Sequence, residues 1–432
     1  MTTWFVLLLA RVFISVVLMI VGVYISENFW HRLKGSHILI WYGIRILSMF
    51  LLICVYNQIP SDVIGWYQHA HWIIDNKAIP GIDFRTPYYI GFNYVIALSV
   101  WIYDSPMAIA LSFALIELIG VFAWKGAMQI IWGEKVGNKT IILYLTSPIF
   151  FANSWLAAQD ETIALCTMGL FLLIIAQKKS IFKGLALLAC SVMFSKILTV
   201  FYIVPFSLMR KFRFVAALIF GLVLCVSIFW LVGINPFDFS FAHELGVESK
   251  NIDSIMRICT SGNIWYLMPS STLKMALPIC TLGLGVIYFM FFGVFSEGWY
   301  SRARIEGMIM LLCSSFVVFC LLYPMTWGSY CIPIVIPLFL IFHFGGRLSS
   351  RVFRVTVFLW VLIMAWKDFF KCGIASLPSP MATGMVVTIT VGAILVNALL
   401  LCLIILKYKS YGLMNRKKIK NGIENILSVN AW

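Results

Sequence analysis

Long apolar segments, separated by short polar ones, recur along the chain from Trp4 to Ile405. A transmembrane helix needs about 20 mostly apolar residues, and fewer where it is tilted or broken. The pattern predicts an all-α bundle of about 13 spans that forms a single transmembrane domain, residues 1–432. The predicted spans are 4–25, 38–55, 107–124, 140–151, 162–176, 184–208 (two half-length helices), 214–232, 275–294, 308–322, 332–344, 355–366 and 386–405.

Two long polar segments, 57–106 and 235–274, interrupt this pattern and lie on the same predicted side of the membrane. The first is rich in Trp and Tyr, which is typical of segments at the level of the lipid headgroups. Within it, 62–76 predicts an interfacial helix that ends before the Pro80-Gly81 turn. Residues 88–103 are apolar but short, so we expect a helix that dips into the membrane or lies on its surface. If this helix spans the membrane instead, every later segment changes sides.

Composition and charge support a membrane protein and determine its predicted orientation. Hydrophobic residues make up 62% of the chain and charged residues only 11%, about half the charged share of a soluble domain. The net charge of +15 could suggest a nucleic-acid partner. However, 22 of the 32 Lys and Arg residues fall on one side of the predicted spans, as the positive-inside rule requires. We therefore expect no nucleic-acid partner, an external N-terminus and a cytoplasmic basic tail, 407–432.

Acidic residues have the opposite distribution, because eleven of the 17 fall on the external side. Chemistry that depends on carboxylates is therefore expected there. The 11 cysteines form no C-x-x-C pair, and His69 and His71 are two positions apart, so a helix would not place them on one face. No metal ligands and no cofactor are assigned; a divalent metal remains open but is not favoured.

The external segments offer the residue types that transfer from a phosphate-linked donor requires. A carboxylate can accept the proton of an acceptor hydroxyl, and cations can stabilise the negative charge of a departing phosphate. Aromatic side chains can pack on a sugar or a lipid headgroup. The candidates are the carboxylates Asp62, Asp83 and Asp160 and the cations Lys196, Arg85 and Arg257.

Several motifs carry a resemblance to a known family. Ser61-Asp62 is followed by Tyr67 and by the run Lys77-Ala78-Ile79-Pro80-Gly81-Ile82-Asp83-Phe84-Arg85-Thr86-Pro87-Tyr88, Ser147-Pro148 leads through Asn153 to Gln159-Asp160, and Lys196 precedes Pro205. This pattern, over about residues 55–210, resembles the GT-C glycosyltransferase superfamily, particularly bacterial polyprenyl-phosphate-dependent members related to mycobacterial mannosyltransferases. Trp327-Gly328-Ser329-Tyr330, before Pro333 and Pro337, is a looser similarity. The chain departs from the family pattern at Thr86-Pro87, where a double proline is usual, and at Pro80-Gly81-Ile82, where Pro-Tyr is usual.

The resemblance implies an inverting glycosyltransferase in a bacterial inner membrane. It would move a sugar from a polyprenyl-phosphate donor to a glycan or glycolipid acceptor on the extracytoplasmic face, with membrane lipid as its surroundings. It also implies roles for individual residues. Asp62 would be the catalytic base with Asp83 as the second choice, Lys196, Arg85 and Arg257 would bind the donor phosphate, and Asp160, Gln159 and Tyr67 would contact the acceptor or the loops.

Each candidate also has a purely structural interpretation. Asp62 could cap the helix that follows it, Asp83 could stabilise a turn, Asp160 could sit at a helix start, and Lys196 could extend to the headgroups. Arg11, Arg45 and Glu117 lie within apolar spans and are assigned no role beyond pairing with one another or reaching the membrane surface.

Two other functions fit the same topology. An O-antigen-type polysaccharide polymerase also has about a dozen spans and two large external loops, but it would rely on loop arginines such as Arg257. A secondary transporter or lipid flippase would instead require charged residues at the membrane midplane and paired broken helices, and only the segment around Lys196 reads as interrupted.

Overall fold

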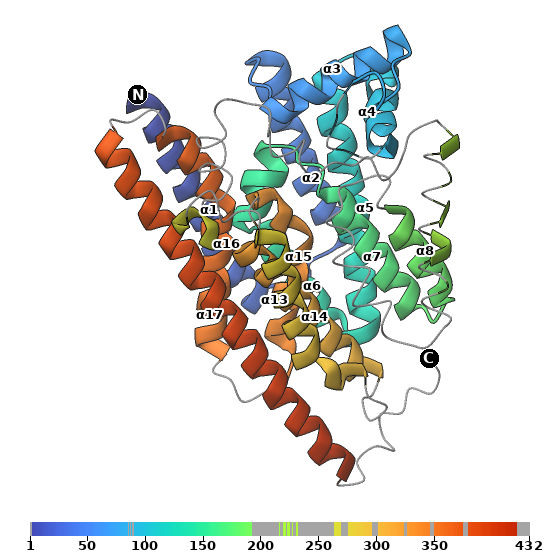
Figure 1. Cartoon of the computed structure of the whole chain (residues 1–432), viewed down its shortest axis with the longest axis vertical. Helices are drawn as coiled ribbons and strands as arrows, with labels where there is room; N and C mark the ends of the chain where they lie inside the picture. Colours follow the sequence, from blue (N-terminus) through green and yellow to red (C-terminus); the bar gives the residue numbers. More distant parts are fainter. Residues whose placement is uncertain are drawn as a thin grey trace. The chain divides into compact units, whose positions relative to one another are not determined.

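The structure is a computed structural model that describes residues 2–84, 86, 88, 90–191, 263–268, 275–295, 301–323, 326–345, 350–374, 379–420 and isolated positions within 216–231. These residues are helical, with no β-strand among them (Figure 1). The predicted all-α class is therefore confirmed for the described part of the chain. The sequence predicts one continuous domain, whereas the described residues pack into two compact units, drawn from 1–21, 146–149 and 249–432 for the first and 22–145 and 150–248 for the second.

The second unit contains the segment 57–106 and the turn before Thr162. Its helices are η1 (Trp30–Arg32), α2 (Gly35–Phe50), η2 (Leu51–Val55), α3 (Ser61–Asn76), α4 (Ile90–Ile102), α5 (Pro106–Trp132), α6 (Glu134–Leu145), η3 (Phe150–Leu156), α7 (Thr162–Ala176) and α8 (Ile181–Ser191). Two of these, η2 and η3, are π-helical. Figure 1 shows α3 running across the direction of α5 and α7 rather than parallel to them.

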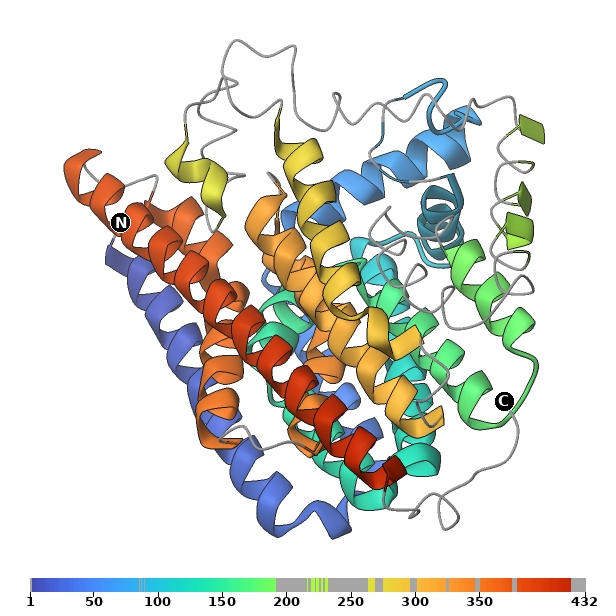
Figure 2. The ribbon, with the colours of Figure 1, turned by 60° about the horizontal axis from the view of Figure 1, so that its bottom comes forward.

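The first unit is built mainly from the C-terminal helices. They are η5 (Ile264–Leu267), α13 (Ala276–Met290), η7 (Phe292–Phe295), α14 (Ser301–Leu322), η8 (Gly328–Cys331), α15 (Ile332–Leu340), η9 (Ile341–His343), α16 (Ser350–Ile374) and α17 (Ser379–Lys420), while α1 (Thr2–Asn28) contributes its first 20 residues. Helices α13 and α14 lie side by side in both views (Figure 2). The Trp366 indole donates a hydrogen bond to the Ser15 hydroxyl, which joins α16 to α1 within this unit.

Five described helices are long and apolar enough to cross a membrane, which supports the predicted membrane protein. They are Val6–Asn28, Gly35–Val55, Pro106–Trp132, Arg302–Leu322 and Gly384–Gly412, and shorter apolar helices occupy Gly91–Ile102, Thr162–Ala176, Phe182–Ser191, Pro278–Met290 and Gly328–His343. Residues 192–208 of the predicted segment 184–208, and most of the predicted span 214–232, lie outside the described residues. Thirteen spans therefore remain a prediction.

The helices agree with the apolar pattern but extend beyond it. The pattern ends a span at Trp124, whereas α5 continues to Trp132 and stops only at Gly133, whose φ of 91° interrupts the helix. Lys139, placed in a cytoplasmic loop by the pattern, lies in α6 and forms a salt bridge with Glu27. Hydropathy identifies only the apolar part of a helix. The helix can continue into turns that carry polar residues, because a long Lys side chain there can reach polar surroundings.

Local signals account for the ends of α3 and α5. Lys77 adopts the left-handed conformation, with φ of 52°, at the C-terminus of α3, which is a common way to end a helix. At the start of α5 the Ser105 hydroxyl accepts a hydrogen bond from the Met107 N–H, and Pro106 occupies the first turn. Both features are preferred at helix N-termini.

Helices α5 and α7 approach each other through glycine. A Cβ atom on Gly120 would lie 2.6 Å from the Cα atom of Cys166, and one on Gly169 would lie 2.8 Å from the Gly120 carbonyl oxygen. The Trp124 indole donates to the Leu165 carbonyl at 3.0 Å across the same contact. Only small residues permit this separation between the two backbones.

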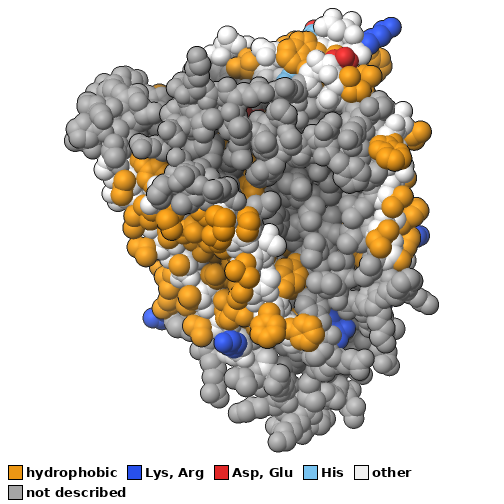
Figure 3. Space-filling view, viewed as in Figure 1, with side chains coloured by type: hydrophobic (Ala, Val, Ile, Leu, Met, Phe, Trp, Pro, Cys, Tyr) orange, Lys and Arg blue, Asp and Glu red, His pale blue; other side chains and the backbone are white. Residues whose placement is uncertain are grey.

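Hydrophobic side chains predominate on the described outer surface of α13 and α17 (Figure 3). Leu282, Phe289 and Leu395 are 70%, 81% and 63% exposed. Large apolar groups on the outside of helices with buried polar interiors are typical of proteins surrounded by lipid rather than water.

Candidate functional site

Asp62, which the resemblance suggests as the catalytic base, lies near the start of α3. It is the second residue of α3, exposed, and the residue at the N-cap position is Pro60. The alternative in which Asp62 is the N-cap is therefore wrong, although the carboxylate still lies in the positively polarised first turn of the helix. Its Oδ2 accepts a hydrogen bond from Gln159 Nε2 at 2.8 Å.

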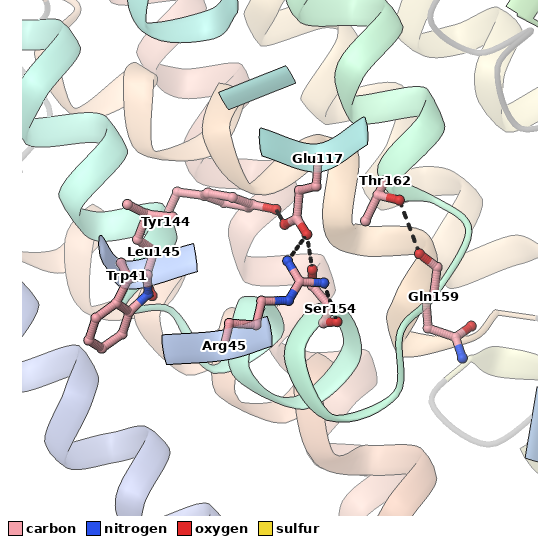
Figure 4. Close-up of polar contacts among 8 residues, drawn as sticks. All are labelled: Trp41, Arg45, Glu117, Tyr144, Leu145, Ser154, Gln159 and Thr162. Atoms are coloured by element: carbon pink, nitrogen blue, oxygen red, sulfur yellow. Dashed lines mark hydrogen bonds and ion pairs between the residues drawn. The ribbon is translucent and has the colours of Figure 1, made fainter. Parts of the chain in front are cut away.

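Gln159 is held by the end of η3. Its backbone N–H donates to the Asn153 carbonyl at 3.2 Å, and Ala158 before it is buried in the left-handed conformation, with φ of 50°. The Thr162 hydroxyl donates to the Gln159 carbonyl at 3.2 Å (Figure 4). These contacts fix the main chain around Gln159, so its amide can orient Asp62, 97 positions earlier in the chain.

Asp83 acts as a turn residue in this structure. Its Oδ2 accepts a hydrogen bond from the Ile79 N–H at 2.7 Å. The same turn contains Gly81, with φ of 86°, whose N–H donates to the Phe84 carbonyl at 3.0 Å. The Asp83 carboxylate thus stabilises the return of the chain after α3, which agrees with its structural interpretation.

Asp160 is fully buried, and its neighbour Glu161 is 2% exposed. Glu161 occupies the N-cap position of α7 without a side-chain capping bond, and the Asp160 carbonyl accepts from the Ile163 N–H at 2.9 Å. Both carboxylates therefore lie at the start of α7, where the helix dipole favours negative charge. Burial does not favour direct contact between Asp160 and an acceptor.

Tyr67 belongs to an exposed polar cluster that the sequence analysis did not assemble. Tyr67, His71 and Asp75 follow one another at four-residue spacing along α3, and Asp104 from the α4–α5 connection completes the cluster. The Tyr67 hydroxyl donates to Asp104 Oδ1 at 2.5 Å. The His71 Nδ1 and Nε2 atoms lie 2.8 Å from Asp75 Oδ2 and 3.0 Å from Asp104 Oδ1.

The pKa values in this cluster shift in the directions that its contacts require. The hydrogen bond to Asp104 raises the pKa of Tyr67 to about 12, and the one from Tyr67 lowers the pKa of Asp104. The hydrogen bond to Asp75, followed by that to Asp104, raises the pKa of His71. Burial lowers the pKa of His69, whose ring packs against those of Trp72 and Phe84.

The largest difference from the sequence analysis is a buried network around Glu117. Glu117 on α5 and Arg45 on α2 are both fully buried and form an ion pair. Glu117 also accepts hydrogen bonds from the hydroxyls of Tyr144 and Ser154 (Figure 4). The second Arg45 nitrogen, Nη2, donates to the Ser154 carbonyl at 2.7 Å.

Aromatic residues enclose this network. The Arg45 guanidinium lies 5.4 Å from the ring centroids of both Tyr42 and Phe150. The Trp155 indole donates to the Ser48 hydroxyl at 2.5 Å, which attaches η3 to α2 a second time. Charged residues in the middle of apolar helices are rare and usually paired or functional. The sequence analysis allowed pairing among Arg11, Arg45 and Glu117, and the structure shows that Arg45 pairs with Glu117. It did not indicate the contacts of Tyr144 and Ser154 with Glu117.

Three candidate cations, Arg85, Lys196 and Arg257, lie outside the described residues. In the first unit, the Trp327-Gly328-Ser329-Tyr330 motif packs against α16. The Gly328 N–H donates to Asp368 Oδ2 at 2.6 Å, and a Cβ atom there would lie 2.2 Å from the Met364 carbonyl oxygen. The motif therefore has a packing role within that unit.

Comparison with known proteins does not identify a family. The sequence matches no protein-family model, and no curated protein is significantly similar to it.

Proposed function

We propose that this chain is an inverting glycosyltransferase that moves a sugar from a polyprenyl-phosphate donor to a glycan or glycolipid acceptor at the extracytoplasmic face of a bacterial inner membrane. The observation that carries the proposal is the contact between Asp62 and Gln159. It brings together two segments, 57–106 and the turn before α7, that the sequence analysis assigned to the same external face.

The proposed chemistry follows from the environment of Asp62. The carboxylate is exposed, and its Oδ1 atom accepts no hydrogen bond from a described residue. It can therefore accept the proton of an acceptor hydroxyl while the hydroxyl oxygen attacks the anomeric carbon. The bond from that carbon to the phosphate oxygen breaks, and the phosphate leaves with the electron pair. Arg85 and Lys196 are the proposed cations for this phosphate.

Gln159 has a distinct role in this proposal. Its amide group donates to one carboxylate oxygen of Asp62 without bringing a positive charge to the site. It thereby orients the Asp62 carboxylate and leaves Oδ1 available for the hydroxyl group of the sugar acceptor. Asp83 is the weaker candidate, because its Oδ2 already accepts from the Ile79 N–H. Metal dependence is not proposed.

A secondary transporter or lipid flippase is the second candidate, and one observation favours it. Arg45 and Glu117 lie in the middle of two helices long enough to span a membrane, where transported ions or substrates are commonly bound. However, three donors already bond to the Glu117 carboxylate. A group so fully engaged is better suited to holding helices together than to binding and releasing a substrate.

The test is Asp62→Asn, assayed with a panel of synthetic polyprenyl-phosphate sugars. Asparagine keeps the shape and can still accept the Gln159 hydrogen bond, but it cannot take up the proton. We expect transfer to fall by about 10²–10⁴-fold, with unchanged abundance in the membrane. Asp83→Asn is the matched control and should retain transfer. Near-normal turnover of Asp62→Asn would exclude Asp62 as the base, and loss only in Asp83→Asn would move that role to Asp83.

A further inference from the structure

We infer that Arg45 and Glu117 are positioning residues that hold Gln159, and through it Asp62, in the proposed site. The inference rests on the proposed function for its catalytic consequence, but its structural part stands independently. It assigns a role to two charged residues that the proposed chemistry does not otherwise use. Three contacts connect Arg45 to Asp62: Arg45 with η3, η3 with Gln159, and Gln159 with Asp62.

The first link is the forked contact of Arg45. One guanidinium nitrogen pairs with Glu117 and the other donates to the Ser154 carbonyl at 2.7 Å. Because the guanidinium is planar and rigid, these two contacts set the distance between α5 and η3. The Ser154 hydroxyl, which also donates to Glu117, prevents η3 from rotating about the first contact.

The second link runs through the π-helical geometry of η3. In a π-helix the backbone is wider than in an α-helix, and such segments are frequent at functional sites. Ser154 and Asn153 are adjacent, and the Asn153 carbonyl accepts from the Gln159 N–H at 3.2 Å. If Ser154 is held in place, the adjacent Asn153 carbonyl, which accepts the hydrogen bond from the Gln159 N–H, is held in place as well.

The third link returns to α2. Arg45 lies on α2, and the chain continues from α2 through η2 and residues 56–60 to α3, which carries Asp62. The Gln159 amide then meets Asp62 at 2.8 Å. The chain thus forms a closed loop of contacts: α2 holds η3 through Arg45, and η3 holds the start of α3 through Gln159. Loosening Arg45 should allow Asp62 and Gln159 to separate.

The structural test measures this separation directly. In full-length protein in native membranes, Asp62→Cys and Gln159→Cys are cross-linked with a short bis-methanethiosulfonate reagent, and the 62–159 peptide pair is quantified by mass spectrometry. Adding Arg45→Lys keeps the positive charge for Glu117 but removes the fork, so the yield of this pair should fall. An unchanged yield would overturn the inference.

Two milder variants separate positioning from stability. Ser154→Ala and Tyr144→Phe each remove one hydroxyl donor to Glu117, but only Ser154 lies in η3. We expect a lower cross-linking yield in Ser154→Ala and an unchanged yield in Tyr144→Phe. Equal yields in the two would show that η3 is not held through this network. Lys139→Gln, which breaks the separate salt bridge to Glu27, controls for general loosening of the unit.

The catalytic arm uses the chain with native Asp62 and Gln159. In Arg45→Lys we expect kcat to fall by about 10²-fold, as for a misplacement of about 1 Å, with little change in the KM for the donor and with normal kcat in Lys139→Gln. Full activity of Arg45→Lys would overturn the catalytic consequence. If the unmodified chain transfers no sugar while the cross-linking differences are observed, the proposed function fails and the positioning role remains.

Discussion

Two polar clusters of the second unit use similar chemical groups in opposite surroundings. The Arg45–Glu117 network combines a base, an acid and hydroxyls with no access to solvent. The cluster on α3 combines His71 and Asp104 with the Tyr67 hydroxyl, and solvent reaches its side chains, with that of His71 32% exposed and that of Asp104 67%. Desolvation makes a charge in the first cluster depend on its partner, whereas water can replace a lost partner in the second.

Because of these surroundings, the two clusters can serve different purposes. A buried pair holds helices in one arrangement, because breaking it leaves an unpaired charge in an apolar interior. An exposed cluster contributes little to stability, but it responds to pH because a histidine is part of it. We therefore expect contacts among α2, α5 and η3 to determine the stability of the unit, and contacts on α3 to determine how its stability depends on pH.

The largest effect is expected from Glu117→Met. This change leaves the buried Arg45 guanidinium without its countercharge, so the free energy of unfolding in detergent should fall by about 3–5 kcal/mol. The double variant Arg45→Met/Glu117→Met removes both charges and should recover much of this loss. A double variant no more stable than Glu117→Met would show that the ion pair does not dominate the network.

A smaller effect is expected from Gly120→Ala at the contact between α5 and α7. The new Cβ atom would lie 2.6 Å from the Cys166 Cα atom, and overpacking of this kind typically costs about 1–3 kcal/mol. The matched change in the exposed region is Gly65→Ala on α3, where a Cβ atom would meet nothing within 4 Å. It should leave stability unchanged or raise it by up to about 1 kcal/mol. Equal changes in the stability of the two variants, measured by thermal unfolding, would contradict the close approach of α5 and α7 at Gly120.

The smallest effect is expected from His71→Gln and depends on pH. The pKa of His71 is raised in the folded protein, so its stabilising contribution is fully present below its ordinary pKa of about 6.5. It is lost as the pH rises through the raised value. The stability difference between the native chain and His71→Gln should therefore be largest near pH 6 and disappear in alkaline solution.

His69→Gln is the control for this pH dependence. Burial lowers the pKa of His69, so protonation of this residue should destabilise the folded chain as the pH falls. The native chain should then lose stability in acid relative to His69→Gln, which is the opposite trend. Parallel pH profiles for the two variants, measured by thermal unfolding in detergent, would exclude the assigned contacts of His71.

Local features of the fold could be predicted from the sequence because each depends on neighbouring residues. The pattern placed a helix at 62–76, and the structure has α3 at Ser61–Asn76. It placed another at 88–103, where α4 occupies Ile90–Ile102. Asp83 was recognised as a possible turn residue. Periodicity and turn residues encode these features within a few positions.

The sequence by itself indicated an all-helical, strongly apolar chain with most carboxylates on one predicted side, and it singled out both Asp62 and Gln159. Only the tertiary structure decided which groups meet: Gln159 with Asp62, 97 positions apart, and Arg45 with Glu117, 72 positions apart. Hydropathy reports whether a side chain prefers lipid or water, and it carries no information about its partner. Partners follow from how α2, α5 and η3 pack, because a buried charge is stable only where that packing supplies its counterpart.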